Sequence, residues 1–205
     1  QEPDGYLGTY LPKHRWLEKR DTPATRPLAW DPWVHKYSML GLLAYHDLTG
    51  SPEALEAIRR VAALLEREFG GRSRRDLNKT DHHVGLASGS ILEPLMLLHR
   101  RTGDTAALAL GRRIVEDYWR RPDAARLVPV LRDRGPVNTI GRGKAYEMMS
   151  CFVGLTEYAR VTGETEYLDM LLDARDRIAD TMRYPTGGMS STEHFLPPGV
   201  LPERA

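Results

Sequence analysis

One pattern occurs three times along this chain and limits the folds that it can adopt. Each copy is an apolar run with helical periodicity, then Thr-Gly, then an acidic or hydroxyl residue, and then a second amphipathic run. The glycines of the three pairs are Gly50, Gly103 and Gly163, so successive copies are 53 and 60 residues apart. The three copies read LLAYHDLTGSPEALEAIRRVAALL, LMLLHRRTGDTAALALGRRIVEDY and LTEYARVTGETEYLDMLLDARDRIA. A repeat of this kind predicts three helical hairpins in succession.

The Thr-Gly joint explains how each hairpin would turn. Glycine adopts the left-handed conformation that ends a helix without a Cβ penalty. The side chains of Ser51 and Asp104 are suited to cap the helix that follows, and Pro52 suits its first position. In the third copy Glu164 or Thr165 takes the capping place. A connection this short makes consecutive helices antiparallel.

Helical periodicity continues through both members of each pair. Apolar residues recur at intervals of three and four, which is typical of helices that bury one face. We expect helices over residues 33–48, 52–68, 85–101, 105–120, 144–161 and 166–183. The strongest strand candidate is the segment 126–133, and Pro129 makes it a loop or an edge strand. The chain is therefore expected to be all-α.

The first helix of each pair is more apolar than the second. Helices that are apolar on most sides are surrounded by others, so the first helices form an inner layer and the second an outer one. Inner and outer pairs in succession predict an α/α toroid or solenoid. An (α/α)6 barrel needs six pairs, so residues 1–205 are expected to be a single domain that supplies about half of one. A longer chain or a second copy in a homodimer would then complete the barrel.

Charge and cysteine content exclude several classes of protein. The chain has 29 basic and 28 acidic residues, and no basic stripe with interleaved aromatics that would indicate a nucleic-acid partner. No apolar stretch is long enough to span a membrane, and no signal peptide is visible. Cys151 is the only cysteine, which rules out an intrachain disulfide and a zinc site built from cysteines of this segment. The compartment stays open.

Each expected inner helix begins with polar groups. In a closed barrel such ends face a common funnel, where the helix dipole favours polar or anionic ligands. Structural alternatives exist: His35 suits a hydrogen-bonded core position, and Glu93 and Glu147 suit ion pairs with arginines. His82 and His83 are adjacent, so on a helix they point apart and do not form a metal pair. Together these groups predict a polar, sugar-binding pocket formed by Trp33, His35, Glu93, Lys144 and Glu147.

The segment YPTGGMSSTEHFLPPG, residues 184–199, follows the last expected helix and leads back toward the next inner one. Glycoside hydrolysis needs one carboxylic acid beside the leaving oxygen and a second group as base or nucleophile. Glu193 is the candidate acid, and His194 joins the substrate-binding set. Phe195 is expected to raise the pKa of Glu193 by partial desolvation. An exposed loop glutamate without a catalytic role is the alternative.

Four stretches resemble a known bacterial enzyme family. They are PDGYLGTY, WVHKYSMLGLLAYHDLTG, GKAYEMMSCFVGLTEYARVTGETEYL and YPTGGMSSTEHF. In this order they are similar to β-L-arabinofuranosidases of glycoside hydrolase family 127 and its relative family 146. The likeness runs from Gln1 to about Pro198, and TGG followed by S-x-E-H-F is its most specific part.

The resemblance implies a retaining glycoside hydrolase on an (α/α)6 barrel that releases terminal L-arabinofuranose or a similar sugar. It places Glu193 at the acid/base position and His35 at a histidine that lines the sugar pocket. Lys144 occupies a position where many relatives have a pocket histidine. The implied nucleophile is a zinc-bound cysteine thiolate, because zinc lowers a thiol pKa. The zinc ligands are expected after Ala205, and Cys151 is expected to be a buried structural thiol.

Two other functions remain open from the residues alone. The first is another α/α-toroid sugar enzyme, such as a 2-epimerase-like isomerase in which histidines move protons. The second is a noncatalytic carbohydrate-binding scaffold. In all three cases the partner is a carbohydrate.

Overall fold

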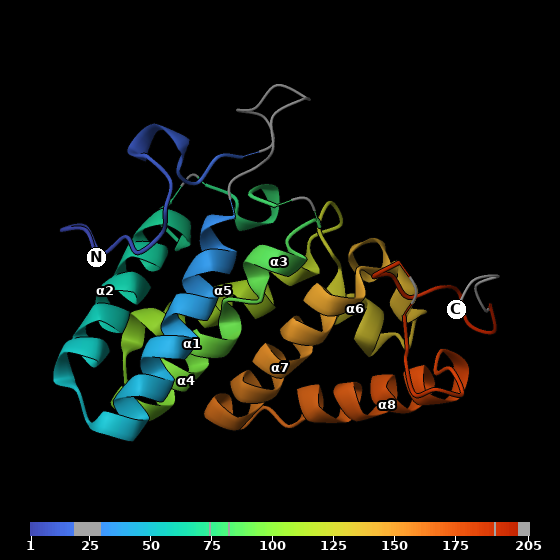
Figure 1. The fold of residues 1–205 in the computed structure, drawn as a ribbon. Coiled ribbons are helices and arrows are strands. Elements are labelled where there is room, and N and C mark those ends of the chain that lie inside the picture. Colours follow the sequence, from blue (N-terminus) through green and yellow to red (C-terminus); the bar gives the residue numbers. More distant parts are fainter. Residues whose placement is uncertain (19–29, 74, 82, 191, 201–205) are drawn as a thin grey trace.

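The computed structural model describes residues 1–18, 30–73, 75–81, 83–190 and 192–200, which fold into a succession of helices (Figure 1). The longer helices are α1 (Asp31–Thr49), α2 (Pro52–Phe69), α4 (Leu92–Thr102), α5 (Thr105–Glu116), α7 (Ala145–Thr162) and α8 (Glu166–Thr181). Short elements lie around them: η1 (Pro12–His14), η3 (Leu77–Lys79), α3 (Leu86–Gly89), η4 (Tyr118–Arg120), α6 (Leu127–Arg132) and η5 (Val137–Gly143). Apart from one isolated bridge between Lys144 and His194, the described part of the chain has no β-structure.

The three predicted Thr-Gly joints are confirmed. Gly50, Gly103 and Gly163 are all left-handed, with φ of 71°, 71° and 77°. The threonine before each glycine bonds back to the carbonyl four residues earlier, at 2.7–2.9 Å, and accepts from the N–H two residues ahead. Ser51 and Asp104 then cap α2 and α5 through Ala54 N and Ala107 N. The second helix of the third hairpin, α8, begins without a side-chain cap, so the prediction that Glu164 or Thr165 caps it is wrong.

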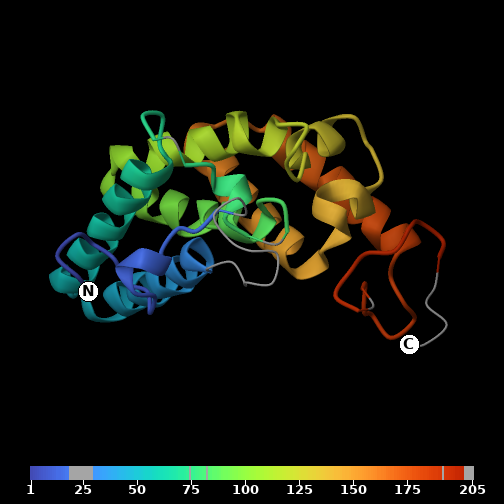
Figure 2. The same ribbon diagram turned by 90° about the horizontal axis from the view of Figure 1, so that it is seen from above.

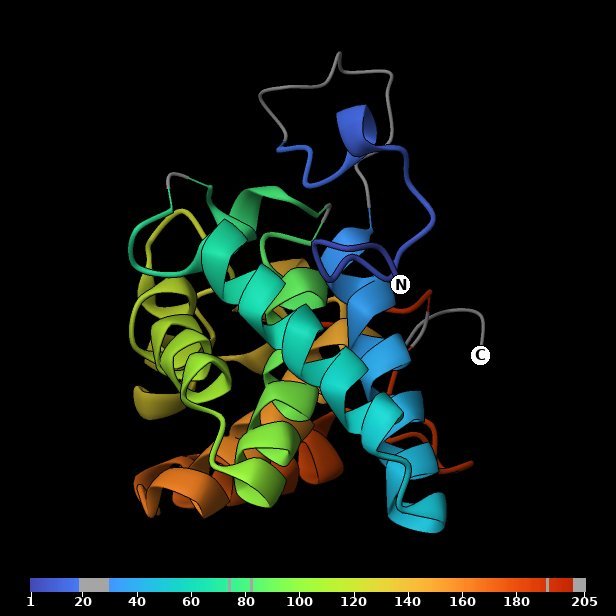
Figure 3. The ribbon, with the colours of Figure 1, turned by 90° about the vertical axis from the view of Figure 1, so that its left-hand side faces the viewer.

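The hairpins follow one another from α1–α2 at one end of the molecule to α7–α8 at the other (Figure 2). Helix α4 packs against α1, α5 and α7, while α2 packs against α1 and α5. The view from the α2 side shows α2 lying across the space between α1 and α5 (Figure 3). The apolar side chains of α4 are buried almost completely, because both neighbours are present. The all-α prediction is confirmed, and the arrangement is that of part of an α/α toroid.

The predicted helix at 85–101 is interrupted, with Ser90 and Ile91 lying between α3 and α4. Pro94 gives the physical reason. A proline inside a continuous helix lacks the N–H that would bond four residues back and clashes with that carbonyl. Restarting the helix at Leu92 places Pro94 in a first turn, where its missing N–H needs no partner.

The prediction of a loop or edge strand at 126–133 is wrong. Residues Leu127–Arg132 form α6. Pro129 lies in the first turn of this helix, so the rule that demotes prolines in strands does not apply. The helix buries Leu127, Val128, Val130 and Leu131.

The inner helices at the two ends of the succession keep exposed apolar residues. Tyr45 and Leu48 on α1 and Met149 and Val153 on α7 are all exposed. These faces belong to the helices predicted to need neighbours on both sides. Completion of the barrel by further chain or by a second copy stays a prediction. Among the described residues, no helix combines the length and the apolar character that crossing a bilayer requires.

Candidate active site

The loop that carries Glu193 is attached to the start of α7. Ala145 N donates to Glu193 O at 2.9 Å, and Phe195 N donates to Gly143 O at 2.8 Å. Lys144 and His194 form the isolated antiparallel bridge between these contacts. The side chain of Phe195 is only 4% exposed, and its burial anchors the loop to the protein. A segment after the last helix is thereby joined to the N-terminus of α7, the inner helix that precedes it in the chain.

The backbone of this loop is strained at Glu193 and at the residue before it. Thr192 and Glu193 are consecutive non-glycine residues in the left-handed region, with φ of 51° and 63°. Each such residue costs on the order of 1 kcal/mol or more and persists only where the surroundings hold it. Backbone pairing to α7 and burial of Phe195 supply that hold. Strain of this kind is typical of positions where a side chain must be presented in one direction.

The carboxylate of Glu193 is paired with the ammonium group of Lys144. The lysine side chain is 10% exposed and the glutamate side chain 74% exposed. The hydrogen bond from Lys144 and its charge hold the pKa of Glu193 below its usual range, with smaller contributions from His194 and His83. The predicted rise of this pKa through desolvation by Phe195 is therefore wrong in sign. Phe195 is buried in the protein, whereas Glu193 stays in water beside a cation.

Close by, a second carboxylate faces a histidine. Glu147 is 5% exposed, and its Oε1 lies 3.5 Å from Nε2 of His83. Its other oxygen, Oε2, is buried and has no hydrogen-bond partner within the described ranges. A buried carboxylate oxygen without a donor is costly in a folded protein. His83 influences Glu193 as well, so the two carboxylates share one neighbourhood.

Aromatic rings extend this group across the starts of α1 and α7. The Trp30 ring centroid lies 5.9 Å from that of His83 and 6.2 Å from that of Trp33. Trp33 in turn contacts Tyr37 at 5.3 Å and Tyr146 at 5.6 Å. The hydroxyls of Tyr37 and Tyr146 are hydrogen bonded at 2.7 Å. These contacts join α1 to α7 across the start of α4.

An ion pair lies beneath the rings. Lys36 is 2% exposed, and its Nζ lies 3.2 Å from Oε2 of Glu93 at the start of α4. The same ammonium group is 5.6 Å from the Trp33 ring centroid and 5.4 Å from that of Tyr37. Its positive charge is thus shared between a carboxylate and two aromatic faces. Glu93 pairs with this lysine, and not with an arginine as its structural alternative supposed.

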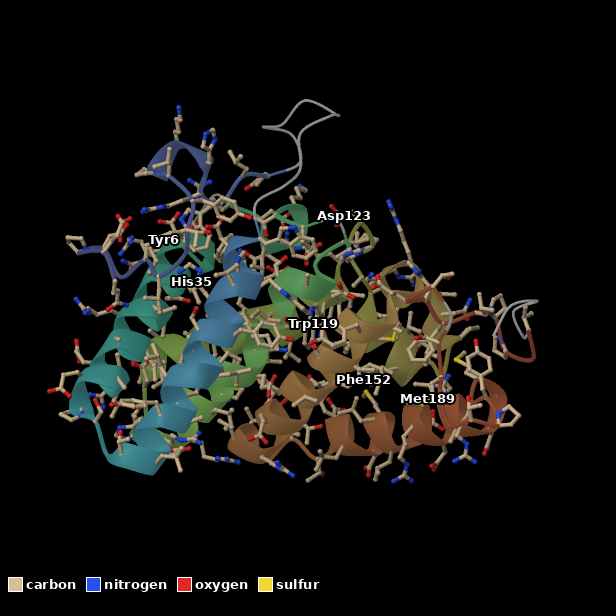
Figure 4. The ribbon with its side chains drawn as sticks, viewed as in Figure 1. Tyr6, His35, Trp119, Asp123, Phe152 and Met189 are labelled. Atoms are coloured by element: carbon tan, nitrogen blue, oxygen red, sulfur yellow. The ribbon has the colours of Figure 1, made fainter. Side chains whose placement is uncertain are left out.

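His35 has a different environment from the other predicted site residues. It is fully buried, and Figure 4 shows it beside Tyr6, with the ring centroids 4.9 Å apart. Its Nδ1 is 2.7 Å from Asp31 O, and Leu7 N donates to its Nε2 at 3.1 Å. Burial lowers its pKa, so the ring is neutral with the proton on Nδ1. Both nitrogens serve backbone groups, an arrangement that anchors residues 1–18 on α1 and leaves no ring nitrogen for a sugar.

Cys151 is a buried structural thiol, as predicted. It is fully buried, its Sγ lies 3.1 Å from Leu86 O, and burial raises its pKa well above the usual range. No cluster of three or more potential metal ligands occurs among the described residues. His82 lies outside the described residues. The described residues thus include no group that could hold the zinc ion, whose ligands the resemblance places after Ala205.

The structure brings together most of the predicted site residues at the starts of α1, α4 and α7. These are Trp33, Glu93, Lys144, Glu147, Glu193 and His194. The structure adds partners that the predicted pocket did not include: Trp30, Lys36, Tyr37, His83 and Tyr146. Their signal was present in the sequence, since each lies in the same helix-start segments as a chosen residue. The sequence did not indicate which of these side chains would contact one another.

A comparison with family models identifies the family of the chain. The model described as β-L-arabinofuranosidase, GH127 catalytic domain, matches residues 1–205. The chain belongs to glycoside hydrolase family 127. A search of curated proteins found no match. For this GH127 domain the resemblance seen in the motifs is confirmed, and so is its class: it is a glycoside hydrolase domain of the arabinofuranosidase-like type.

Proposed function

We propose that this GH127 domain removes a terminal L-arabinofuranose, or a similar sugar, from a glycan with retention of anomeric configuration. The proposal rests on one observation above all, which is the presentation of Glu193. This residue has a strained backbone, is joined to the N-terminus of an inner helix, and extends its carboxylate into solvent beside Lys144. The family match supplies the reaction class.

In this proposal Glu193 is the acid/base residue. It would first donate a proton to the leaving glycosidic oxygen and later accept one from water. Lys144 stabilises the ionised form, which opposes the first step and favours the second. The free enzyme is then expected to work best on the acidic side of neutrality, where a carboxyl with a lowered pKa still carries its proton part of the time.

The nucleophile is not assigned to any residue of this segment. A zinc-bound cysteine thiolate remains a proposal based on the family, with its ligands expected outside residues 1–205. Zinc would lower the thiol pKa and so supply a nucleophile at neutral pH. Cys151 does not suit this role, because its thiol is buried and bonded to a backbone carbonyl.

The test is hydrolysis of a panel of aryl glycosides by the full-length protein. The panel contains both anomers of aryl L-arabinofuranoside and the common aryl pyranosides. We expect release of L-arabinose or a close analogue, and proton NMR of the first product should show the anomer of the substrate. A folded protein that is silent across the panel, or that exchanges a ring proton in deuterium oxide without cleavage, would contradict the proposal.

A further inference from the structure

Three rings form an exposed aromatic surface between α1 and α7. Tyr37 is 42% exposed and Tyr146 is 58% exposed, while Trp33 between them is half-buried. Trp33 contacts both tyrosines, and each of these contacts is close to edge-on. We call Trp33, Tyr37 and Tyr146 the aromatic platform.

The aromatic platform is held rigidly from two sides. The hydroxyl pair of Tyr37 and Tyr146 links residues that are 109 positions apart in the sequence. Beneath the rings, Lys36 is locked by its ion pair with Glu93 and contacts the faces of Trp33 and Tyr37. Burial and the contact with Tyr146 raise the pKa of Tyr37 to about 12, so its hydroxyl keeps its proton throughout the working range. Rings that are fixed before a ligand arrives lose little entropy on binding.

The platform lies next to the proposed acid/base residue. Tyr146 follows Lys144 by two residues, and Lys144 carries the ion pair to Glu193. Ala145, between them, donates its N–H to Glu193 O. Ring contacts also lead from the platform toward this carboxylate: Trp33 contacts Trp30, and Trp30 contacts His83. The charge of His83 in turn contributes to the lowered pKa of Glu193.

Chemistry distinguishes this surface from the other exposed apolar residues. Tyr45 and Leu48 on α1 are also exposed, at 55% and 87%, but neither belongs to the ring contacts that join Trp33, Tyr37 and Tyr146. The platform combines flat apolar faces with two hydroxyls and a neighbouring Lys36–Glu93 pair. A sugar ring offers the complementary surface, with C–H groups on its face and hydroxyls around its edge.

We propose that Trp33, Tyr37 and Tyr146 form a stacking subsite for the sugar that neighbours the one removed, on the leaving-group side. This inference rests on the proposed function. The exposure of the residues indicates which side of the cleaved bond the platform serves. Lys144 and Glu147 are buried and suit the terminal sugar, whereas the platform opens to solvent, where the remaining glycan must lie. The ligand class is an oligosaccharide with an unsubstituted ring face at its second residue.

The experiment compares two substrates that differ only in the second sugar. They are methyl L-arabinofuranoside, which has no ring in the leaving group, and an L-arabinofuranosyl disaccharide. In Tyr146→Ala, kcat/KM for the disaccharide should fall on the order of tenfold while that for the methyl glycoside changes little. Tyr146→Phe keeps the ring and should keep most of the preference. Tyr45→Ala, an exposed tyrosine on α1 outside the platform, is the matched control and should alter neither.

Equal losses on both substrates, or no loss on either, would overturn the subsite. A fall in the melting temperature of Tyr146→Ala without a change in substrate preference would also overturn it. That result would show that the Tyr146 side chain packs against another segment of the protein and does not bind sugar. If the wild-type protein cleaves neither substrate, the proposed function fails independently. The subsite is then decided by calorimetric titration with the disaccharide: binding that Tyr146→Ala loses and Tyr45→Ala keeps supports it, and absence of binding overturns it.

Discussion

Lys144 and Glu193 form a direct ion pair that ties the start of α7 to the loop after α8. The lysine is buried and the glutamate is exposed, so the cation has few alternatives to this partner. This ion pair affects the chemistry of Glu193, because a nearby ammonium group favours the ionised form of a carboxylate. Lys144 therefore favours the ionised form of the residue that we propose as the acid/base group.

Replacement of Lys144 by methionine should shift the pH dependence of hydrolysis. Lys144 lowers the pKa of Glu193, so its removal raises that pKa toward the ordinary value of a carboxyl group. A general acid must be protonated, and activity is lost as pH rises through its pKa. The basic limb of the kcat/KM profile should thus move to higher pH in Lys144→Met. Lys144→Arg keeps the charge and should leave the limb near its original position; a shift to lower pH in Lys144→Met would contradict the argument.

Substitution of Glu193 by glutamine should reduce hydrolysis of glycosides by about 10²- to 10⁴-fold, the usual contribution of a positioned acid or base. The loss should be smaller for aryl leaving groups of low pKa, since these depart with less help from a proton. Glu56→Gln, on the exposed side of α2, is the matched control and should keep full activity. Retention of wild-type kcat by a folded Glu193→Gln variant would remove this residue from the mechanism.

The thiol of Cys151 should be inert while the protein is folded. It is completely buried, and burial raises its pKa, so little thiolate forms near neutral pH. A coloured disulfide reagent should modify it in denaturant and only very slowly in buffer. Cys151→Ala should keep its hydrolytic activity and lose about 1 kcal/mol of stability to the small cavity. Prompt labelling of the native protein would show that the thiol is accessible.

Two helical glycines should respond in opposite directions to alanine. In α7, a Cβ at Gly154 would lie 3.0 Å from Glu93 N and 3.1 Å from Leu92 Cβ, so Gly154→Ala should push α4 away from α7. Overpacking of this kind costs about 1–3 kcal/mol. In α1, nothing lies within 4 Å of a Cβ at Gly41, and Gly41→Ala should gain about 0.5–1 kcal/mol from helix propensity. Urea denaturation of the two variants measures both; a stabilised Gly154→Ala would mean that α4 and α7 are less closely packed than described.

Much of the fold followed from the sequence because helices and their joints depend on short-range interactions. At Thr49-Gly50, for example, the turn is built from bonds that reach only four residues back and two ahead. The exceptions lie at two prolines. Pro94 and Pro129 both lie in first turns, and where a helix restarts depends on packing that a periodicity rule does not include.

The candidate site was predictable as a set of residues and not as a set of contacts. The sequence alone determined that polar and aromatic groups gather at the starts of inner helices and that Glu193 lies in a loop after the last one. Only the tertiary structure decided that Lys144 meets Glu193, that His83 meets Glu147 and that Tyr37 meets Tyr146. These partners are distant along the chain, and the energy of a charge or ring contact depends on separation in space. That is why the direction of the Glu193 pKa shift, which one neighbouring ammonium group decides, could not be read from the sequence.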